Sequence, residues 1–210
     1  MSRVVGSRAL HLWSLHEDVV IEDDGGDGEL VLRSAFGTER INRPDPLVRE
    51  ALRRMELGPV LLANAVPRSS PPPEGTCMVL LPALDPLSHL IVRTLSWEDL
   101  RGPLLSVVPT TRDARFTPAS LSEQRLIRLI GDVSLTLEKA GFALACAASA
   151  HRVHLHRPEA IWVVGLLAWP ATPSGASSVL PLPPEVTQAV LSYLVAAGMT
   201  EDCGEPPPSG

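Results

Sequence analysis

The sequence predicts an α+β fold with tandem winged helix-turn-helix modules and a mixed middle segment. Short stretches in which apolar and polar residues alternate indicate strands. Apolar residues at helical spacing, directly after proline-marked helix starts, indicate helices. The order of strands, helix, turn and helix is the order of a winged helix-turn-helix. With 210 residues, the chain is long enough for two small domains with a core.

The first module is expected over residues 8–67. Asp45 is the expected N-cap of its helix and Pro46 the first helical residue, where the missing N–H costs nothing. Apolar residues follow at helical spacing as far as Met55, and Gly58-Pro59 ends the helix. The extended stretches expected before the helix are 9–15, 18–22, 30–33 and 38–42, with a loop rich in Asp and Gly at 23–28.

A proline-rich linker is expected over residues 68–75, followed by a middle segment over 76–124. Apolar runs in the middle segment are repeatedly broken by proline. We expect a short helix over 78–84 and strands over 89–94 and 104–108. This part of the chain is therefore predicted to be mixed in structure.

The second module is expected over residues 125–200, with a disordered tail at 201–210. A strand pair, 126–137 with 142–147, is expected to precede a third strand over 150–156. Along this third strand side chains alternate, which places apolar residues on one face and polar residues on the other. The apolar face carries Val153 and Leu155, and the polar face carries Arg152, His154 and His156.

Two helices are expected after these strands. The first starts at Pro158 and is apolar nearly all round, so it must lie within a core. A break at 170–173 separates it from a second helix, which opens at Pro183 and ends at Gly198. An arginine-proline pair precedes the helix in each half of the chain, at Arg43-Pro44 and Arg157-Pro158. We therefore predict that the two modules are related.

The charge of the chain argues against nucleic acid as a partner. Its formal net charge is −6, and a field of this sign repels a phosphate backbone. The helix expected over 183–199 has no basic residue and only Gln188 as a base reader. The N-terminus lacks the apolar core of a signal peptide, and the most apolar run, 161–171, is too short to span a membrane. We expect a cytoplasmic protein with no nucleic-acid or membrane partner.

No metal site and no catalytic centre is expected in this chain. His154 and His156 share a strand face, but His151 points the other way and no further ligand lies at metal-binding spacing. Ser149 or Cys146 with His151 would make a nucleophile and a base, yet no third residue is indicated to orient the base. A solvated strand face is the preferred interpretation of the histidines. No phosphate-binding loop or dinucleotide-binding motif occurs in the sequence.

Five stretches of the sequence carry a family resemblance. In order, they are LHLWSLHEDVVIE, REALRRMELGPVLLANA, RGPLLSVVPTTRDARFTP, SAHRVHLHRPEAIWVVGLLAWPATP and AVLSYLVAAGM. Over residues 10–199 the chain resembles the N-terminal region of SagB-type dehydrogenases, the FMN-dependent azoline oxidases of thiazole/oxazole-modified peptide biosynthesis. The resemblance implies tandem modules of the RiPP recognition element kind, which bind a precursor's leader peptide by adding it as a strand to a sheet edge. In the family, a nitroreductase-like FMN domain follows this region, whereas here the chain ends in GEPPPSG.

The resemblance implies a leader-peptide recognition or scaffold part of a SagB-type dehydrogenase system. No cofactor is expected in this chain, with FMN held by a partner or missing domain. The expected partners are the precursor leader peptide, a flavin dehydrogenase domain or subunit and, as a further candidate, a cyclodehydratase. An acidic winged-helix regulator that acts through protein contacts is the alternative.

Two surfaces could accept a leader peptide as an added strand. One lies at the strands of the first module beside the helix 46–55, and the other at the strand 151–156 beside the helix 185–195. We favour the first, with the added strand at the edge near 19–22 or near 30–33, because the arginines on the outer side of its helix suit an acidic leader. The candidate peptide-binding residues are Val19, Ile21, Leu30, Val31, Arg49 and Arg53.

The purified chain is expected to be colourless and to bind no DNA. FMN needs a phosphate clamp and a surface for its ring, and the sequence has no basic, glycine-rich stretch of that kind. The net charge of −6 leaves few phosphates that could be neutralised. Visible absorbance and a gel shift at moderate salt test both expectations. A bound flavin spectrum, or a DNA complex that weakens steeply with salt, would contradict them.

Overall fold

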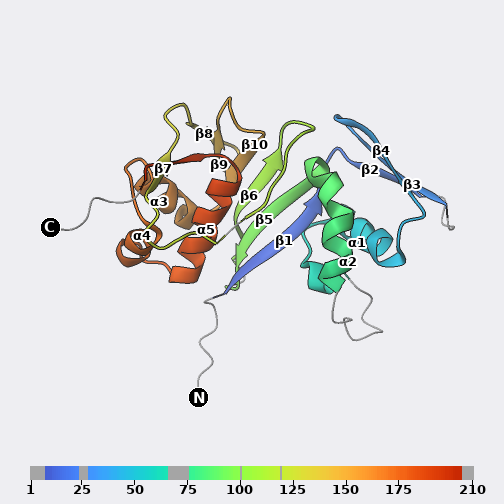
Figure 1. The fold of residues 1–210 in the computed structure, drawn as a ribbon, viewed down its shortest axis with the longest axis horizontal. Coiled ribbons are helices and arrows are strands. Elements are labelled where there is room, and N and C mark those ends of the chain that lie inside the picture. The colour runs from blue at the N-terminus through green and yellow to red at the C-terminus, as the bar shows by residue number, and fades with distance from the viewer. Residues whose placement is uncertain (1–7, 24–27, 66–75, 100, 119, 205–210) are drawn as a thin grey trace, which may run out of the picture. The chain divides into compact units, whose positions relative to one another are not determined.

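The computed structural model describes residues 8–23, 28–65, 76–99, 101–118 and 120–204. It is a mixed α+β structure with antiparallel sheets, as the sequence predicts (Figure 1). The expected linker, 68–75, lies outside the described residues, and so do residues 205–210 of the expected tail. No helix in the described part of the chain is long and apolar enough to cross a bilayer.

The chain divides into two compact units. The N-terminal unit consists of residues 11–94 and 108–115, and the C-terminal unit of residues 1–10, 95–107 and 116–210. Residues of the expected middle segment, 76–124, fall in both units. Three of the four boundaries between the units fall within strands, β1 (Ala9–Leu15), β5 (Ile91–Trp97) and β6 (Pro103–Pro109), and the fourth lies between residues 115 and 116.

The N-terminal unit contains a three-stranded sheet followed by helices. Its strands are β2 (Val20–Asp23), β3 (Glu29–Ser34) and β4 (Gly37–Asn42), in the order β2-β3-β4. The helices are α1 (Pro46–Leu57), η1 (Leu62–Asn64), α2 (Thr76–Leu84) and η2 (Asp85–Leu90).

The first helix begins where the sequence predicts. Asp45 Oδ1 accepts a hydrogen bond from the N–H of Leu47 at 2.8 Å, and Pro46 occupies the first turn. Gly58, with φ of 143°, ends the helix in a conformation that favours glycine. The buried face of α1 packs with the apolar side chains of β3, and this cluster includes Leu30, Leu32, Val48, Ala51, Leu52 and Met55.

The C-terminal unit contains the strands β7 (Ile127–Leu129), β8 (Ser134–Glu138), β9 (Gly141–Ala145), β10 (His151–Leu155) and β11 (Thr200–Asp202). Its helices are α3 (Pro158–Leu166), α4 (Pro173–Val179) and α5 (Pro184–Ala196). The six-stranded sheet has the order β1-β5-β6-β10-β9-β8, and β7 pairs separately with β11. Gly141 closes the β8–β9 hairpin with φ of 136°, and a Cβ there would lie 2.4 Å from the Leu155 carbonyl oxygen, so glycine is required.

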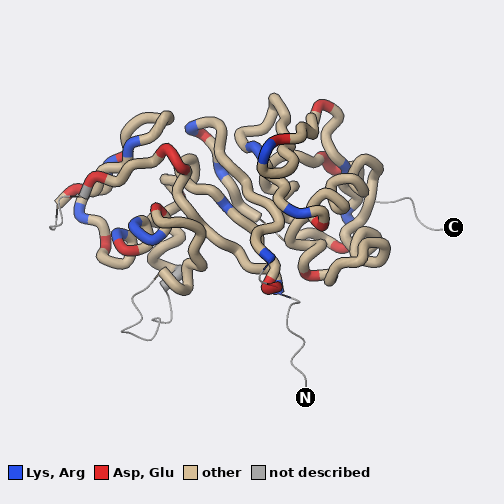
Figure 2. Tube along the Cα trace, turned by 180° about the vertical axis from the view of Figure 1, so that it is seen from behind, with Lys and Arg blue, Asp and Glu red and all other residues tan. Residues whose placement is uncertain are grey.

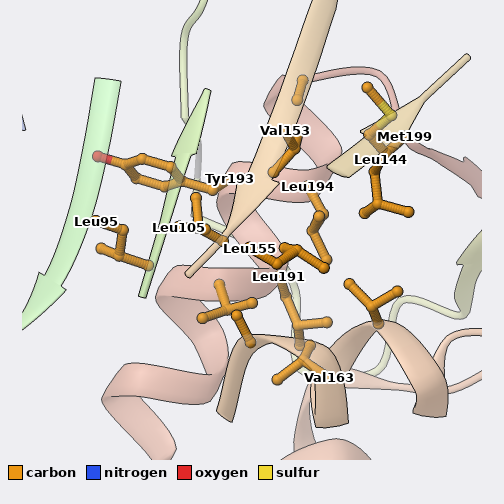
Figure 3. Close-up of a cluster of buried hydrophobic side chains, with 14 of the residues drawn as sticks. Leu95, Leu105, Leu144, Val153, Leu155, Val163, Leu191, Tyr193, Leu194 and Met199 are labelled. Atoms are coloured by element: carbon orange, nitrogen blue, oxygen red, sulfur yellow. The ribbon is translucent and has the colours of Figure 1, made fainter. Parts of the chain in front are cut away.

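The core of this unit lies between one face of the sheet and the helices α3 and α5 (Figure 3). Val153 and Leu155 point to this side of β10, as the predicted alternation requires. Burial of each such side chain stabilises the fold by about 1.5–3 kcal/mol. Residues labelled in Figure 3 that belong to this core include Leu144, Val163, Leu191, Tyr193, Leu194 and Met199.

The structure differs from the predicted elements in four places. The stretch 126–137 forms two strands, because a turn at 131–132 separates β7 from β8. Residues 85–90 form a 3-10 helix started by Asp85-Pro86, so β5 begins at Ile91 rather than at 89. The break at 170–173 contains the start of α4, whose N-cap Thr172 accepts from Gly175 N–H at 3.1 Å. Residues 201 and 202 belong to β11 and not to a tail.

A cluster of two arginines and two carboxylates holds the start of α3. Arg157, which is 8% exposed, donates to both oxygens of Asp99 at 3.0 and 2.9 Å. It also donates to Glu159 at 3.2 and 2.5 Å. Arg101 bridges the same two carboxylates, at 2.9 Å from Asp99 and 3.0 Å from Glu159. The cluster is neutral and ties the β5–β6 loop to the first turn of α3.

The Trp97 ring and the charges around Asp99 complete this cluster. The guanidinium carbon of Arg157 lies 5.5 Å from the ring centroid of Trp97. Burial raises the pKa of Asp99, but hydrogen bonds from Arg157 and Arg101 outweigh it and lower this pKa from 3.8 to about 2. The difference corresponds to roughly 2 kcal/mol in favour of the ionised carboxylate in the folded state.

Replacement of Asp99 should therefore destabilise the chain in a pH-dependent way. The folded-state pKa is depressed, so the contribution of Asp99 is complete above about pH 4 and is lost as the pH falls toward 2. We expect Asp99→Asn to lower the free energy of unfolding by roughly 2 kcal/mol at neutral pH, with the difference from the parent shrinking below pH 4. Urea unfolding across this pH range measures it. Glu123→Gln, at an exposed position of the same unit, is the control, and an equal, pH-independent loss in both variants would contradict the assignment.

Candidate functional site

The edges of the sheet in the N-terminal unit are β2 and β4 (Figure 1). The central strand is β3, which pairs antiparallel with β2 on one side and with β4 on the other. The sequence indicated the stretch 30–33 as one of two possible edges for an added peptide. This interpretation was wrong, because a strand with two partners has no free backbone groups for a third. The other candidate stretch, 19–22, overlaps the edge strand β2.

The pairing register shows which backbone groups of β2 point away from the sheet. Ser34 and Gly37 close a two-residue turn, and such a closing pair is hydrogen-bonded. Successive residues of β3 turn their backbone groups toward β4 and β2 in turn. Because Ser34 faces β4, Arg33 and Val31 turn their N–H and C=O groups toward β2. Ile21 lies between their two partners on β2, so its own N–H and C=O point to the free side of the strand. An added strand would pair with these groups.

The candidate peptide-binding residues do not form one surface. Val19 and Leu30 belong to the core, where Val19 is 6% exposed and Leu30 is completely buried. Neither side chain can touch a peptide unless the core opens. Val31 is half-buried and lies on the opposite face of β3 from Leu30, because side chains alternate along a strand. Ile21 is half-buried on the edge strand and packs against the core. Only Ile21 among these four combines an edge position with partial exposure.

The arginines of α1 lie on its outer side, as expected. The Arg49 side chain donates to the carbonyl of Gly28 at 3.4 Å, which places it beside the start of β3. Arg53 is exposed one turn further along. Arg54 pairs with Glu50 at 2.7 Å across one helical turn. Basic and acidic positions are interspersed in both units, and α1 carries three arginines against two glutamates (Figure 2).

The second surface considered for a peptide, at β10, has no free edge. β10 pairs with β9 on one side, and the N–H of His156 donates to the Leu104 carbonyl of β6 at 2.9 Å on the other. The helix α5 is committed to the core, where Val186, Val190, Leu191 and Leu194 are completely buried. The edge strand at this end of the six-stranded sheet is β8.

The histidines of this strand occupy opposite faces, as the alternation predicts. His151 is buried with its ring 5.8 Å from that of Phe116, and burial lowers the pKa of this imidazole. His154 and His156 stack on the other face at 6.5 Å between ring centroids. No group of three potential ligands that could hold a metal ion occurs among the described residues. These histidines therefore contact neighbouring side chains of the folded sheet, as structural residues do.

The two nucleophile candidates beside His151 have structural partners. The Ser149 hydroxyl donates to the Ala197 carbonyl at 2.6 Å and accepts from the backbone N–H of His151 at 2.9 Å. It thus shapes the turn between β9 and β10. The thiol of buried Cys146 donates to Asp132 Oδ1 at 3.3 Å. These contacts do not use the His151 imidazole, so they give no support to a nucleophile and base at this place.

A hydroxyl and an imidazole do meet elsewhere, at a pair that the sequence analysis did not single out. Ser106 Oγ on β6 lies 2.9 Å from His156 Nε2 beside β10. Burial lowers the pKa of His156, and the neighbouring His154 lowers it further, which favours the neutral imidazole. The available signal was the single polar residue in the apolar stretch 104–108, together with the alternating polar positions of 151–156. A nucleophile would also need an oriented base and oxyanion donors, so the observed contact supports a cross-strand hydrogen bond.

The edge of β2 beside α1 is therefore the best candidate site in the N-terminal unit. It offers outward backbone groups at Ile21, with Arg49 and Arg53 on the accompanying helix. Such an arrangement can bind an extended peptide by main-chain hydrogen bonds. In comparisons with known proteins, the chain matches no family model and no curated protein.

Proposed function

We propose that this chain recognises the leader peptide of a precursor, as the scaffold part of a SagB-type FMN-dependent azoline dehydrogenase system. The observation that carries the proposal is the edge strand β2, whose outward groups at Ile21 lie in a unit with an arginine-bearing helix. The resemblance of five ordered sequence stretches to the N-terminal region of such dehydrogenases supports the same function.

The element order supports the finer fold proposal of tandem winged-helix modules. In the N-terminal unit, the antiparallel meander β2-β3-β4 leads into α1 and α2. In the C-terminal unit, the antiparallel meander β8-β9-β10 leads into α3, α4 and α5. An arginine-proline pair follows the third strand in both cases, at Arg43-Pro44 and Arg157-Pro158. Two modules of one type would account for this repetition.

In this proposal the leader binds as a fourth strand beside β2. Main-chain hydrogen bonds to Ile21 hold the peptide, and alternate peptide side chains contact the sheet and α1. Arg49 and Arg53 favour acidic side chains in the leader. Oxidation of the azolines belongs to a flavin dehydrogenase domain or subunit that holds FMN, with a cyclodehydratase as a further cytoplasmic partner.

Proline at position 21 should weaken the binding of an added strand more than removal of the Ile21 side chain does. Proline removes the outward N–H while the hydrogen bonds from β2 to β3 remain, which is why edge strands tolerate it. Acidic peptides selected from a displayed library on the full chain serve as probes in fluorescence anisotropy. We expect Ile21→Pro to bind at least about tenfold more weakly than Ile21→Ala. Equal binding by both variants, with loss in Arg40→Pro on β4, would move the site to the other edge.

Charge reversal on α1 should weaken binding in a salt-dependent way. We expect Arg49→Glu with Arg53→Glu to lower affinity for the selected acidic peptides roughly tenfold at low salt, and less at high salt because exposed charges are screened. The double variant Arg125→Glu with Arg128→Glu makes the same change in net charge in the C-terminal unit and should bind as the parent does. Equal weakening by both double variants would show a general charge effect and contradict the site.

A further inference from the structure

The edge strand β8 exposes apolar side chains. It ends the six-stranded sheet and has β9 as its neighbour on one side. Leu135 and Leu137 are 47% and 71% exposed, and the remaining residues of the strand are exposed or half-buried. An exposed strand edge with apolar side chains is a template for pairing with another chain. Natural edge strands usually carry lysine, proline or a bulge that prevents this. The sequence of β8, SLTLE, has no lysine or proline, and its pairing with β9 runs one to one without a bulge.

The alternation of hydrogen bonds can be followed from β6 to β8. The bond from His156 N–H to the Leu104 carbonyl at 2.9 Å shows that His156 faces β6. Since residues alternate, His154 also faces β6, whereas Val153 and Leu155 face β9. Their partners on β9 are therefore bonded to β10 and not to β8.

The next step shows which groups of β8 are free. Ala143 and Ala145 alternate with the β9 residues that bond to β10, so they face β8, where Ala143 pairs with Thr136. Leu135 and Leu137 lie on either side of Thr136, and their N–H and C=O groups must point away from the sheet. The two-residue turn after Glu138 leads to the same assignment, because its closing pair is hydrogen-bonded.

We propose that two copies of this chain associate through their β8 strands, antiparallel about a two-fold axis at Thr136. In this register Leu135 of one copy lies opposite Leu137 of the second copy, and the reverse pair forms symmetrically. Both are hydrogen-bonding pairs, because both leucines turn their backbone groups outward. The two sheets join into one continuous sheet, and the two-fold axis closes the assembly at a dimer.

The side chains of β8 suit a second copy of itself. On one face leucine meets leucine, and on the other Thr136 meets its own counterpart, pairs that stabilise antiparallel strands. The single ionisable side chain of the strand, Glu138, forms an ion pair with Arg152, and its Oε2 lies 3.5 Å from Nδ1 of His154 in the same unit. In the proposed register Glu138 lies opposite Ser134, so no like charges meet. A strand that carries several charges of one sign would repel a second copy of itself. The strand β8 carries no such set of charges.

The association state of the full chain tests the proposal. Sedimentation velocity over a range of concentrations should show a shift from monomer to dimer. Leu137→Lys places a charge at the edge and should weaken the dimer at least tenfold. Val179→Lys is the matched control, since Val179 is 70% exposed in the same unit but lies at the end of α4. A parent that stays monomeric at every concentration, a species larger than a dimer, or equal effects of both variants would overturn the proposal.

A cysteine scan tests the register. Residues opposite each other in a non-hydrogen-bonded antiparallel pair have Cα atoms about 4.5 Å apart, within the range that a disulfide bridges. Thr136→Cys should therefore cross-link to its counterpart under mild oxidation, above the level of the parent. Ser134→Cys should not, because the two copies of residue 134 would lie roughly 14 Å apart along the strands. Cross-linking through residue 134 and not through 136 would overturn the proposed two-fold pairing.

Discussion

Pairing of β10 on both sides is the constraint on which the C-terminal unit depends. With the strand held between β6 and β9, its alternating side chains divide into a core face with Val153 and Leu155 and a polar face with Arg152 and His154. A shift of one residue in the pairing register of β10 would exchange these faces and bring the guanidinium of Arg152 and the imidazole of His154 into the core. The same register determines, two strands away, which backbone groups of β8 remain free.

The start of α3 is held by a second constraint, the pairing of buried charges. Arg157 sits between β10 and Pro158 with little exposure, and a buried guanidinium is costly unless it is paired. Asp99 and Glu159 provide that pairing, and Arg101 neutralises the second negative charge. The helix itself is apolar, so its position is set by burial along its length and by this charged cluster at its start. Local charge balance and core packing thus act on the same element.

Local signals in the sequence were sufficient where the structure is determined locally. Asp45 and Pro46 begin α1 as predicted, since a cap and a fixed φ act within one turn. The alternation over 151–156 was also confirmed, because burial of one strand face leaves a periodic pattern. The stop at 170–173 was predicted, but α4, which starts at its last residue, was not, because Thr172 and Pro173 signal a break and a helix start equally.

Neighbours in the sheets could not be predicted in the same way. Whether β3 or β10 lies at an edge depends on strands that pair with it from elsewhere, and its own residues show only that it is half-buried. The partner of β7 is β11, some seventy residues later in the chain, as the pair Arg128 with Glu201 shows. For this reason the candidate peptide-binding set mixed core residues such as Leu30 with the edge residue Ile21. Amphipathic patterns identify faces, whereas edges follow from topology.

The first strand of each meander is an edge, and the two edges differ in their chemistry. At β2, Ile21 packs inward and α1 of the same unit carries three arginines, so the proposed partner at this edge is an acidic peptide with a sequence unlike that of the strand itself. At β8, two leucines are exposed and the single carboxylate is neutralised within the unit, which suits a strand with exposed leucines and no unpaired charge. The sequence of β8 itself has these properties. Two edges of similar backbone geometry can therefore serve different partners because their flanking charges differ.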